Sequence, residues 1–391
     1  MSDKKMNMQV LLDQLVEWRR YLHKNPETAF EEKRTAKFIS EKLIEMGYKV
    51  ETEIGKTGVV ASLKVGNGDK IIGIRADIDA INITEQTGLP YASQNEGKMH
   101  ACGHDGHIAT ALGTAKLLSE NKDFNGTVRF IFQPAEEPGK GALAMLDDGL
   151  LERFPMDEIY ALHNMPQLDE GKIYSKSGPI MGSEDNFKIH IVGKGGHAST
   201  PNTGIDPLVI AAEIILALQT IVARNINPID TAVVSCTEIQ TDGTTNVIPS
   251  NVYITGDTRS YTPEIQKLLK KRMGTISENI CNAYGAKCNF SYINSFSPTI
   301  NSKECHNVVV EAATNVLGKE NVISETDPMM ISEDFAHFLK KIPGCLVFLG
   351  GKKFSEEVYP LHNAFYDYED ENLLRGAEFF EEIVRLRLSV E

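Results

Sequence analysis

The chain has 391 residues, of which 41% are hydrophobic and 24% are charged, and its formal net charge is −14. This length exceeds what one hydrophobic core usually serves, so we expect two domains, and the ordinary composition argues against a mostly disordered chain. The negative charge repels nucleic acid and anionic membrane surfaces, and the densest basic run, 267–272, has the pattern of a solvated helix face. Neither nucleic acid nor a membrane is therefore expected as a partner.

The six cysteines are too few and too scattered for a disulfide framework in a chain of this length. The first residues lead into an amphipathic segment, and no run approaches the roughly 18 uncharged apolar residues of a membrane span. Secretion and membrane insertion are both disfavoured. The sequence thus predicts reduced thiols and a cytoplasmic protein.

Helix and strand patterns alternate along the first part of the chain. The expected helices are 8–24, 31–46, 106–118 and 141–148, and the expected strands are 48–52, 58–65, 70–76, 127–132 and 158–162. Strands that alternate with helices indicate an α/β fold, a mainly parallel sheet with helices on both faces. In such sheets functional groups collect beyond the carboxyl ends of the strands.

The pattern changes near Gly182, where a half-buried alternating strand ends at a glycine-rich turn. The next expected elements, helix, strand, strand, helix and strand, are 206–224, 231–240, 247–259, 263–282 and 287–293. They suffice for a separate two-layer α/β domain of about 110 residues. The remaining helices and a short strand would complete the first domain. The predicted division is one domain of residues 1–183 and 296–391, interrupted by an inserted domain of residues 184–295.

The densest group of metal-binding residue types lies in 99–107, with the sequence MHACGHDGH. Cys102 and His104 are two positions apart, so in a loop both can face one ion, with Gly103 as the bend between them. Thiolate and imidazole together favour zinc or another transition metal over magnesium or calcium. The alternative is that the histidines of this stretch, His107 included, are core residues with satisfied hydrogen bonds.

Two adjacent carboxylates, Glu136 and Glu137, follow the expected strand 127–132. Neighbouring side chains on an extended segment point opposite ways, so one could bind metal while the other faces a water and moves its proton. Such an arrangement suits amide hydrolysis. Further polar residues at loop positions are Asp77, Asp79, His163 and His362. Taken singly, these residues are also compatible with a solvated turn, a turn cap or a structural histidine.

Six segments resemble the M20 metallopeptidase family: RADIDA (75–80), MHACGHDGH (99–107), FQPAEE (132–137), GKGGHA (193–198), NVIP (246–249) and SEDF (332–335). They are most similar to its N-acyl-amino-acid amidohydrolases, which include hippurate hydrolases, N-acetyl-diaminopimelate deacetylases and auxin-conjugate hydrolases. The resemblance runs nearly end to end. It departs at Ile81-Asn82, where the subfamily usually has Leu-Pro, which leaves the local pocket shape open.

The resemblance implies a catalytic domain with two divalent ions per subunit, zinc or manganese, with cobalt and nickel as alternatives. Glu136 would be the general base and acid, and Asp79 would support a ligand. Other branches carry a histidine at the place of Asp77 and a bridging aspartate at the place of Cys102. The implied ligands are Cys102 as the bridge, His104, Glu137, His163 and His362.

The resemblance also gives the inserted domain a role as a lid and dimerisation domain. In relatives, the histidine at the place of His197 enters the active site of the other subunit of a homodimer and holds the oxyanion of the tetrahedral intermediate. Asn246 and Arg259 resemble substrate-binding residues, and Arg259 suits a bidentate grip on an α-carboxylate. The alternative for Arg259 is a surface charge on a strand.

The expected activity is metal-dependent hydrolysis of the amide of a small N-acyl-L-amino acid, either N-acetyl or N-benzoyl as in hippurate. The alternatives are a dipeptidase of the same fold, an N-acetyl-diaminopimelate deacetylase of lysine biosynthesis, and a dimeric binding protein without catalysis. The last would have lost Glu136 or a metal ligand, and neither is lost here.

Overall fold

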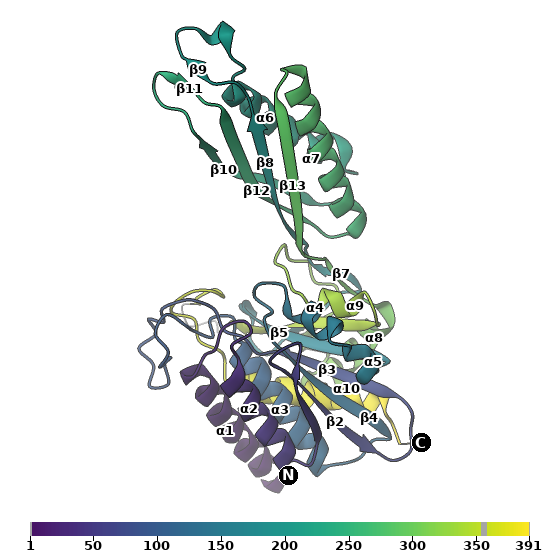
Figure 1. The fold of residues 1–391 in the computed structure, drawn as a ribbon. Coiled ribbons are helices and arrows are strands. Elements are labelled where there is room, and N and C mark those ends of the chain that lie inside the picture. Colours follow the sequence, from purple (N-terminus) through teal and green to yellow (C-terminus); the bar gives the residue numbers. More distant parts are fainter. Residues whose placement is uncertain (1, 353–357, 391) are drawn as a thin grey trace. The chain divides into compact units, whose positions relative to one another are not determined.

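The structure is a computed structural model that describes residues 2–352 and 358–390, with the backbone alone for residues 2–6. The chain divides into two compact units, drawn with their elements in Figure 1. The larger unit comprises Met1–Ile180, Ile300–Asp327 and Asp334–Glu391. The smaller unit comprises Met181–Thr299 and Pro328–Glu333. The sequence carried no indication that the short segment 328–333 leaves the larger unit.

An eight-stranded sheet in the order β1-β2-β4-β3-β5-β16-β6-β15 forms the centre of the larger unit. Its strands are β1 (Lys49–Ile54), β2 (Gly58–Val65), β3 (Ile71–Asp77), β4 (Gly126–Gln133), β5 (Glu158–Asp169), β6 (Ile173–Tyr174), β15 (Val322–Ile323) and β16 (Gly344–Lys352). β3 pairs in parallel with β4 and β5, and β5 pairs in parallel with β16, which confirms the mainly parallel sheet. β2 pairs antiparallel with β1 and β4.

Helices cover both faces of this sheet. Phe130 and Phe132 of β4 belong to a core that the sheet shares with the longer helices, which are α1 (Ser2–Lys24), α2 (Lys33–Glu45), α3 (His104–Glu120), α8 (Lys303–Leu317) and α10 (Glu371–Arg387). Ile131, between them, points to the opposite face, where it lies near Met156. The shorter helices are α4 (Gly141–Asp147), α5 (Leu150–Arg153) and α9 (Ala336–Leu339).

The first helix is anchored by a buried arginine. The Arg19 guanidinium lies 3.5 Å from a carboxylate oxygen of Asp105, 2.8 Å from Asp367 and 2.7 Å from Asp370. One turn later, His23 Nδ1 lies 2.8 Å from Asp105 Oδ2. Burial lowers the pKa of His23, but its contacts with the Asp105 carboxylate outweigh this and raise the pKa to about 9. Both cations therefore hold a carboxylate at the start of α3.

The smaller unit is a four-stranded antiparallel sheet in the order β10-β12-β8-β13. Its strands and helices are β8 (Glu184–Val192), α6 (Pro207–Asn225), β10 (Ala232–Thr241), β12 (Asn251–Ser260), α7 (Pro263–Ala283) and β13 (Lys287–Phe296). Both helices begin with proline after a capping side chain, Asp206 or Thr262. Their apolar residues form one core with Phe187, Ile189 and Ile191 of β8. A short pair, β9 (Gly196–His197) with β11 (Val247–Ile248), also belongs to this unit. The last pair, β7 (Gly178–Met181) with β14 (Thr299–Asn301), contains two of the positions at which the chain passes from one unit to the other.

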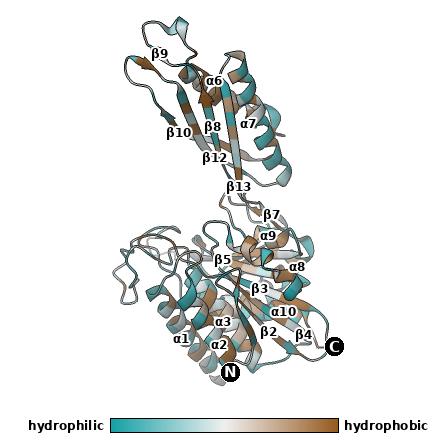
Figure 2. Ribbon diagram, viewed as in Figure 1, coloured by the Kyte–Doolittle hydropathy of each residue, from teal (hydrophilic) through white to brown (hydrophobic). Residues whose placement is uncertain are grey.

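Among the described residues, α6 is the one helix long and apolar enough to cross a membrane by length and composition. Figure 2 shows its hydrophobic colouring. Ile210, Ile214 and Leu218 on one side of α6 are fully buried in the core of the smaller unit. Leu216 on the other side is 71% exposed. The helix therefore serves as a core helix that leaves an apolar face uncovered in the single chain.

Candidate metal centre

Cys102 and His104 are placed by a sharp turn at the start of α3. Gly103, between them, adopts φ +86°, and a Cβ there would lie 2.5 Å from Asn164 Oδ1, so both the backbone and the space require glycine. His104 is fully buried, and its Nδ1 lies 2.9 Å from the backbone oxygen of Asp79. This hydrogen bond fixes a ring proton on Nδ1 and makes Nε2 the nitrogen that can bind a ligand.

The segment after β4 carries Glu136 and Glu137. Both side-chain oxygens of Asp79 accept backbone N–H groups from this segment, Oδ1 from Glu136 at 3.0 Å and Oδ2 from Glu137 at 3.1 Å. Asp79 is almost fully buried. It therefore supports His104 through its backbone and the paired glutamates through its side chain.

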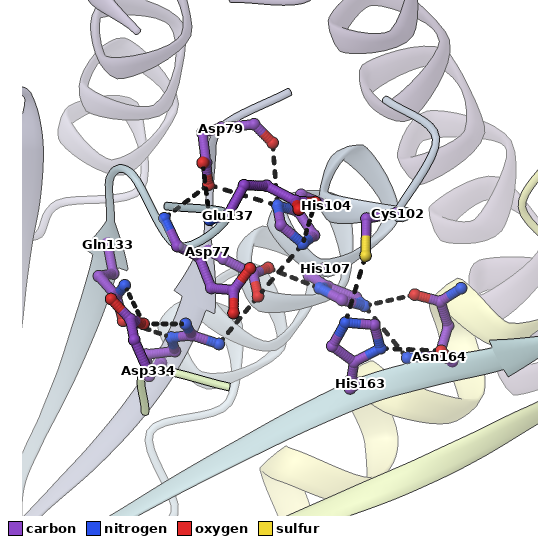
Figure 3. A network of polar contacts seen from close by, with 12 residues as sticks. Asp77, Asp79, Cys102, His104, His107, Gln133, Glu137, His163, Asn164 and Asp334 are labelled. Atoms are coloured by element: carbon purple, nitrogen blue, oxygen red, sulfur yellow. Dashed lines mark hydrogen bonds and ion pairs between the residues drawn. The ribbon is translucent and has the colours of Figure 1, made fainter. Parts of the chain in front are cut away.

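The five residues proposed as ligands lie in one group (Figure 3 shows four of them). Ligand atoms of Cys102, His104 and Glu137 lie within 4.8 Å of one another. Cys102 Sγ is 3.6 Å from His163 Nε2. His362 Nε2 is 3.4 Å from Glu137 Oε1, and the His362 side chain is 53% exposed. The site thus has a buried floor and one solvent-accessible imidazole.

The donor atoms of this group suit a metal ion. His104 Nε2 and Glu137 Oε1 are buried and have no hydrogen-bond partner among the described residues. His163 Nδ1 lies 2.8 Å from the backbone oxygen of Asn164, so its Nε2 lone pair faces Cys102. Buried polar atoms without hydrogen bonds are costly, and a divalent cation would satisfy a thiolate, an imidazole and a carboxylate together. The residues present therefore fit a metal.

The electrostatics of the group also favour a cation. Burial lowers the pKa of His163 well below its usual value, which keeps that imidazole neutral. Burial also disfavours charge on His104, but the carboxylates of Asp77, Asp79 and Glu137 outweigh it and raise its pKa to about 10. Burial opposes ionisation of Glu137 as well, yet His362, His104 and Cys102 lower its pKa. Carboxylates thus dominate the potential around His104.

Asp77 forms a second group of ligand types with His104, His107 and His163. Its oxygens already have partners, because Oδ1 lies 2.6 Å from His107 Nδ1 and Oδ2 accepts from Arg75 at 2.8 Å. His107 Nε2 in turn lies 2.6 Å from Asn164 Oδ1. The sequence allowed His107 to be a core histidine with satisfied hydrogen bonds, but its link to Asn164, which directly follows His163, was not predicted.

The sequence also did not predict a buried polar cluster that is linked to Asp77 through Arg75. Asp334 Oδ1 accepts from Gln133 Nε2 at 2.6 Å and from Arg75 at 3.3 Å, and its Oδ2 accepts from the backbone N–H of Ala142 at 2.9 Å. All four side chains of this cluster, Arg75, Asp77, Gln133 and Asp334, are buried. The resemblance of the SEDF segment, which contributes Asp334, predicted no role for this residue.

The three remaining predicted site residues lie in the smaller unit. His197 and Asn246 are close together, because Ala198 N–H donates to the backbone oxygen of Asn246 at 3.0 Å and Val247 pairs with His197. His197 is exposed, and its Nδ1 lies 2.7 Å from Ser199 Oγ. Arg259 lies near the carboxyl end of β12, and β11 precedes the amino end of that strand.

The guanidinium of Arg259 has carboxylate partners inside the smaller unit. Its Nε donates to Asp257 Oδ1 at 2.9 Å, one terminal nitrogen lies 2.9 Å from Glu184 Oε2, and the other donates to the backbone oxygen of Met330 at 3.3 Å. Ser332 Oγ donates to the same Glu184 oxygen at 2.9 Å. Arg259 is therefore more than an isolated surface charge.

Comparison with known proteins decides the family. The model of peptidase family M20/M25/M40 matches residues 73–386, which is most of the chain. The chain belongs to this family. Among its relatives, a hippurate hydrolase of Campylobacter jejuni is 41% identical over 93% of this chain and 93% of its own length. An N-acetyl-L-cysteine deacetylase of Bacillus subtilis is 39% identical over 96% of this chain and 89% of its own length.

A solved structure of another M20 protein has the same fold. The YXEP protein of Bacillus subtilis, a dinuclear metal-binding peptidase, aligns with a TM-score of 0.85 and 36% identity, covering 97% of this chain and 99% of its own. The expected family, fold class and enzyme class are therefore confirmed: this M20 chain is an α/β amidohydrolase of a metal-dependent family.

Proposed function

We propose that this M20 enzyme hydrolyses the amide bond of N-acyl-L-amino acids, with N-acetyl or N-benzoyl acyl groups, and releases a carboxylic acid and a free amino acid. The observation that carries the proposal is the group of Cys102, His104 and Glu137, whose donor atoms lie within 4.8 Å of one another, with Glu136 directly before Glu137 in the chain. The names of the hippurate hydrolase and deacetylase relatives support the substrate class.

Cys102, His104, Glu137, His163 and His362 would hold two divalent transition-metal ions, zinc or manganese, with cobalt and nickel as alternatives. Metal at this site supplies Lewis acidity toward the substrate carbonyl and lowers the pKa of water. Glu136 would accept the proton of the attacking water and then donate it to the departing amine nitrogen. Asp79 would hold the Glu136 and Glu137 backbone in place during both transfers.

The smaller unit would recognise the rest of the substrate. His197 would donate a hydrogen bond to the oxyanion of the tetrahedral intermediate in the partner subunit of a homodimer, with Asn246 beside it. Arg259 would bind the α-carboxylate. The uncovered face of α6, with Leu216 71% exposed and Val209 55% exposed, supports a dimer that forms through this unit.

A peptidase activity is the second candidate. Thermostable carboxypeptidase 2 of Saccharolobus solfataricus is 35% identical over 95% of this chain, and an N-terminal amino acid differs from an acyl group chiefly by its charged amine. A dipeptidase would need a group that binds this amine. N-acetyl-diaminopimelate deacetylation is a special case of the first proposal, with a longer charged side chain on the amino acid.

A cytoplasmic location is part of the proposal. None of the six cysteines, all of which the structure describes, forms a disulfide, and Cys102 is one of them. A metal-bridging thiolate would be vulnerable to oxidation, so a reducing compartment suits this site.

The test is a substrate and metal screen. Chelated protein is resupplied with zinc, manganese, cobalt or nickel and assayed on N-acetyl amino acids, N-benzoyl amino acids and dipeptides. We expect N-acyl amino acids to be hydrolysed fastest and chelation to abolish turnover. Glu136→Gln should lower kcat by about 10²- to 10⁴-fold while metal stays bound.

The matched control is Glu120→Gln, because Glu120 is an exposed glutamate at the end of α3 whose side chain is 63% accessible. This variant should keep parental activity. Full activity of metal-loaded Glu136→Gln would contradict the proton-transfer role, and faster hydrolysis of dipeptides than of N-acyl amino acids would favour the peptidase.

A further inference from the structure

The turn that presents Glu136 has an unusual backbone. Ala135 adopts φ +48°, in the left-handed region that residues other than glycine rarely occupy. The turn is also tight, because the Gly139 N–H donates to the backbone oxygen of Glu136 at 2.7 Å and the Gly141 N–H donates to the backbone oxygen of Ala135 at 2.9 Å. A left-handed alanine persists only when its surroundings hold it.

Three successive N–H groups of this turn donate to two buried carboxylates. Those of Glu136 and Glu137 donate to Asp79, as described above. The N–H of Ala135 donates to Glu32 Oε1 at 2.9 Å. Glu32 and Ala135 are both fully buried, so water cannot replace this bond. The left-handed residue is therefore held by a carboxylate from a distant part of the sequence.

Glu32 is itself fixed. It lies just before α2, and its second oxygen accepts from Thr57 Oγ1 at 2.5 Å. Thr57 is buried and lies between β1 and β2. Burial is the main cause that raises the pKa of Glu32, to about 7, and its hydrogen bonds oppose this increase. The side chain spans two neighbours and has little freedom to move.

We propose that Glu32 is a positioning residue for Glu136: by accepting the Ala135 N–H, it keeps the turn in the conformation that aims the catalytic carboxylate. This inference rests on the proposed function. Without Glu32, the Ala135 N–H would be buried and unpaired, and the turn would relax toward an ordinary backbone conformation that restores a hydrogen bond. Glu136 would then lose its alignment. The proposed ligands Cys102 and His104 lie outside the turn, and Asp79 would still hold the backbone N–H of the third, Glu137, so the metal site would remain.

The experiment compares four variants by turnover, bound metal and hydrogen–deuterium exchange of a peptide covering residues 133–141. Glu32→Ala should lower kcat by about 10- to 100-fold, because small misplacements of a catalytic group have large effects on rate. KM and metal content should stay within twofold, and exchange in the turn should rise about tenfold. Glu32→Gln should restore most of kcat, because its amide oxygen can still accept the Ala135 N–H.

Two controls separate positioning from general stability. Thr57→Val removes the other partner of Glu32 and should keep kcat. Glu27→Ala removes a similar bond of the same segment, in which Glu27 accepts from the Thr35 N–H at 2.8 Å and from its hydroxyl at 3.0 Å. It should lower the melting temperature and leave exchange in the turn unchanged.

Unchanged exchange in Glu32→Ala, or an equal rise in all variants, would overturn the proposal. Faster exchange with parental kcat would overturn it as well, because the turn would then move without consequence for Glu136. A parental chain that hydrolyses no N-acyl amino acid with any metal would overturn the proposed function instead, and the exchange comparison would still decide whether Glu32 fixes the turn.

Discussion

The proposed metal ligands of the larger unit and the proposed substrate-binding residues of the smaller unit are held in different ways. His104 is fully buried and is oriented by the backbone oxygen of Asp79. The side chain of Asp79 also accepts the backbone N–H of Glu137. His197 is exposed, and its ring contacts Ser199, two residues away. A metal site needs several fixed donors at once, whereas a group that meets a substrate must remain reachable. The difference indicates that the proposed metal ligands are preorganised, whereas His197 is adaptable.

The largest expected effect comes from breaking the preorganised part. His104→Ala removes a buried imidazole whose Nε2 has no hydrogen-bond partner in the described chain. We expect loss of bound metal and a decrease in kcat/KM of more than about 10³-fold, because without metal neither the substrate carbonyl nor the attacking water is activated. Metal analysis of purified protein and steady-state kinetics check this. The matched control, His306→Ala, removes an imidazole bound to the Ser324 backbone oxygen and should retain metal.

His197→Ala tests the adaptable part. Loss of one oxyanion donor should lower kcat by about 10²- to 10³-fold and leave the metal content unchanged. Mixing His197→Ala chains with Glu136→Gln chains should restore part of the activity, because some heterodimer sites would carry both intact residues. No recovery in a demonstrated heterodimer would show that each subunit supplies its own histidine.

Arg259 gives a smaller effect and sharpens the comparison. Its present partners, Glu184 and Asp257, are carboxylates like the group it is proposed to bind, so a substrate must compete with them. Arg259→Lys should raise KM by about tenfold with little change in kcat, because lysine lacks the planar fork. Glu184→Gln should lower KM. A control substrate in which the α-carboxylate of the same N-acyl amino acid is replaced by a carboxamide should show neither change in KM.

Substitution of His23 should have the smallest effect on turnover, and its main effect should be on the pH dependence of stability. Its pKa is raised from 6.5 to about 9, so below pH 6.5 both the folded and the unfolded chain hold the proton, and between pH 6.5 and 9 only the folded chain does. The free energy of unfolding should therefore fall as the pH rises through this window, by at most about 3 kcal/mol. His23→Gln should flatten this fall in urea titrations at several pH values. A slope unchanged by the substitution would contradict the assignment.

The sequence predicted the positions of site residues best where these residues follow neighbouring strands of the sheet. Asp77 ends β3, and Glu136 and Glu137 follow β4, its parallel neighbour, so residues at these strand ends could be expected to converge. The parallel sheet follows from the alternation of strands and helices. Both are local patterns combined with one topological rule.

Long-range pairs were not predictable in the same way. Glu32 contacts Ala135, and Arg19 contacts Asp367, across long separations that no periodicity records. The length of β5 was missed as well, since Asn164 to Gln167 carry polar residues and a proline that resemble a loop, while pairing with β16 keeps them extended. Such features depend on which surfaces meet, and a single sequence does not encode that in its local pattern.

The buried Arg19 has a consequence for biosynthesis. Two of its three carboxylate partners, Asp367 and Asp370, lie near the end of the chain, and the third adjoins His104. A nascent polypeptide that extends only to residue 366 lacks two of the three counterions, so docking of its first helix would bury Arg19 with a single carboxylate partner. Maturation of the metal pocket should accordingly follow synthesis of residues 367–370, and truncation before residue 367 should prevent it.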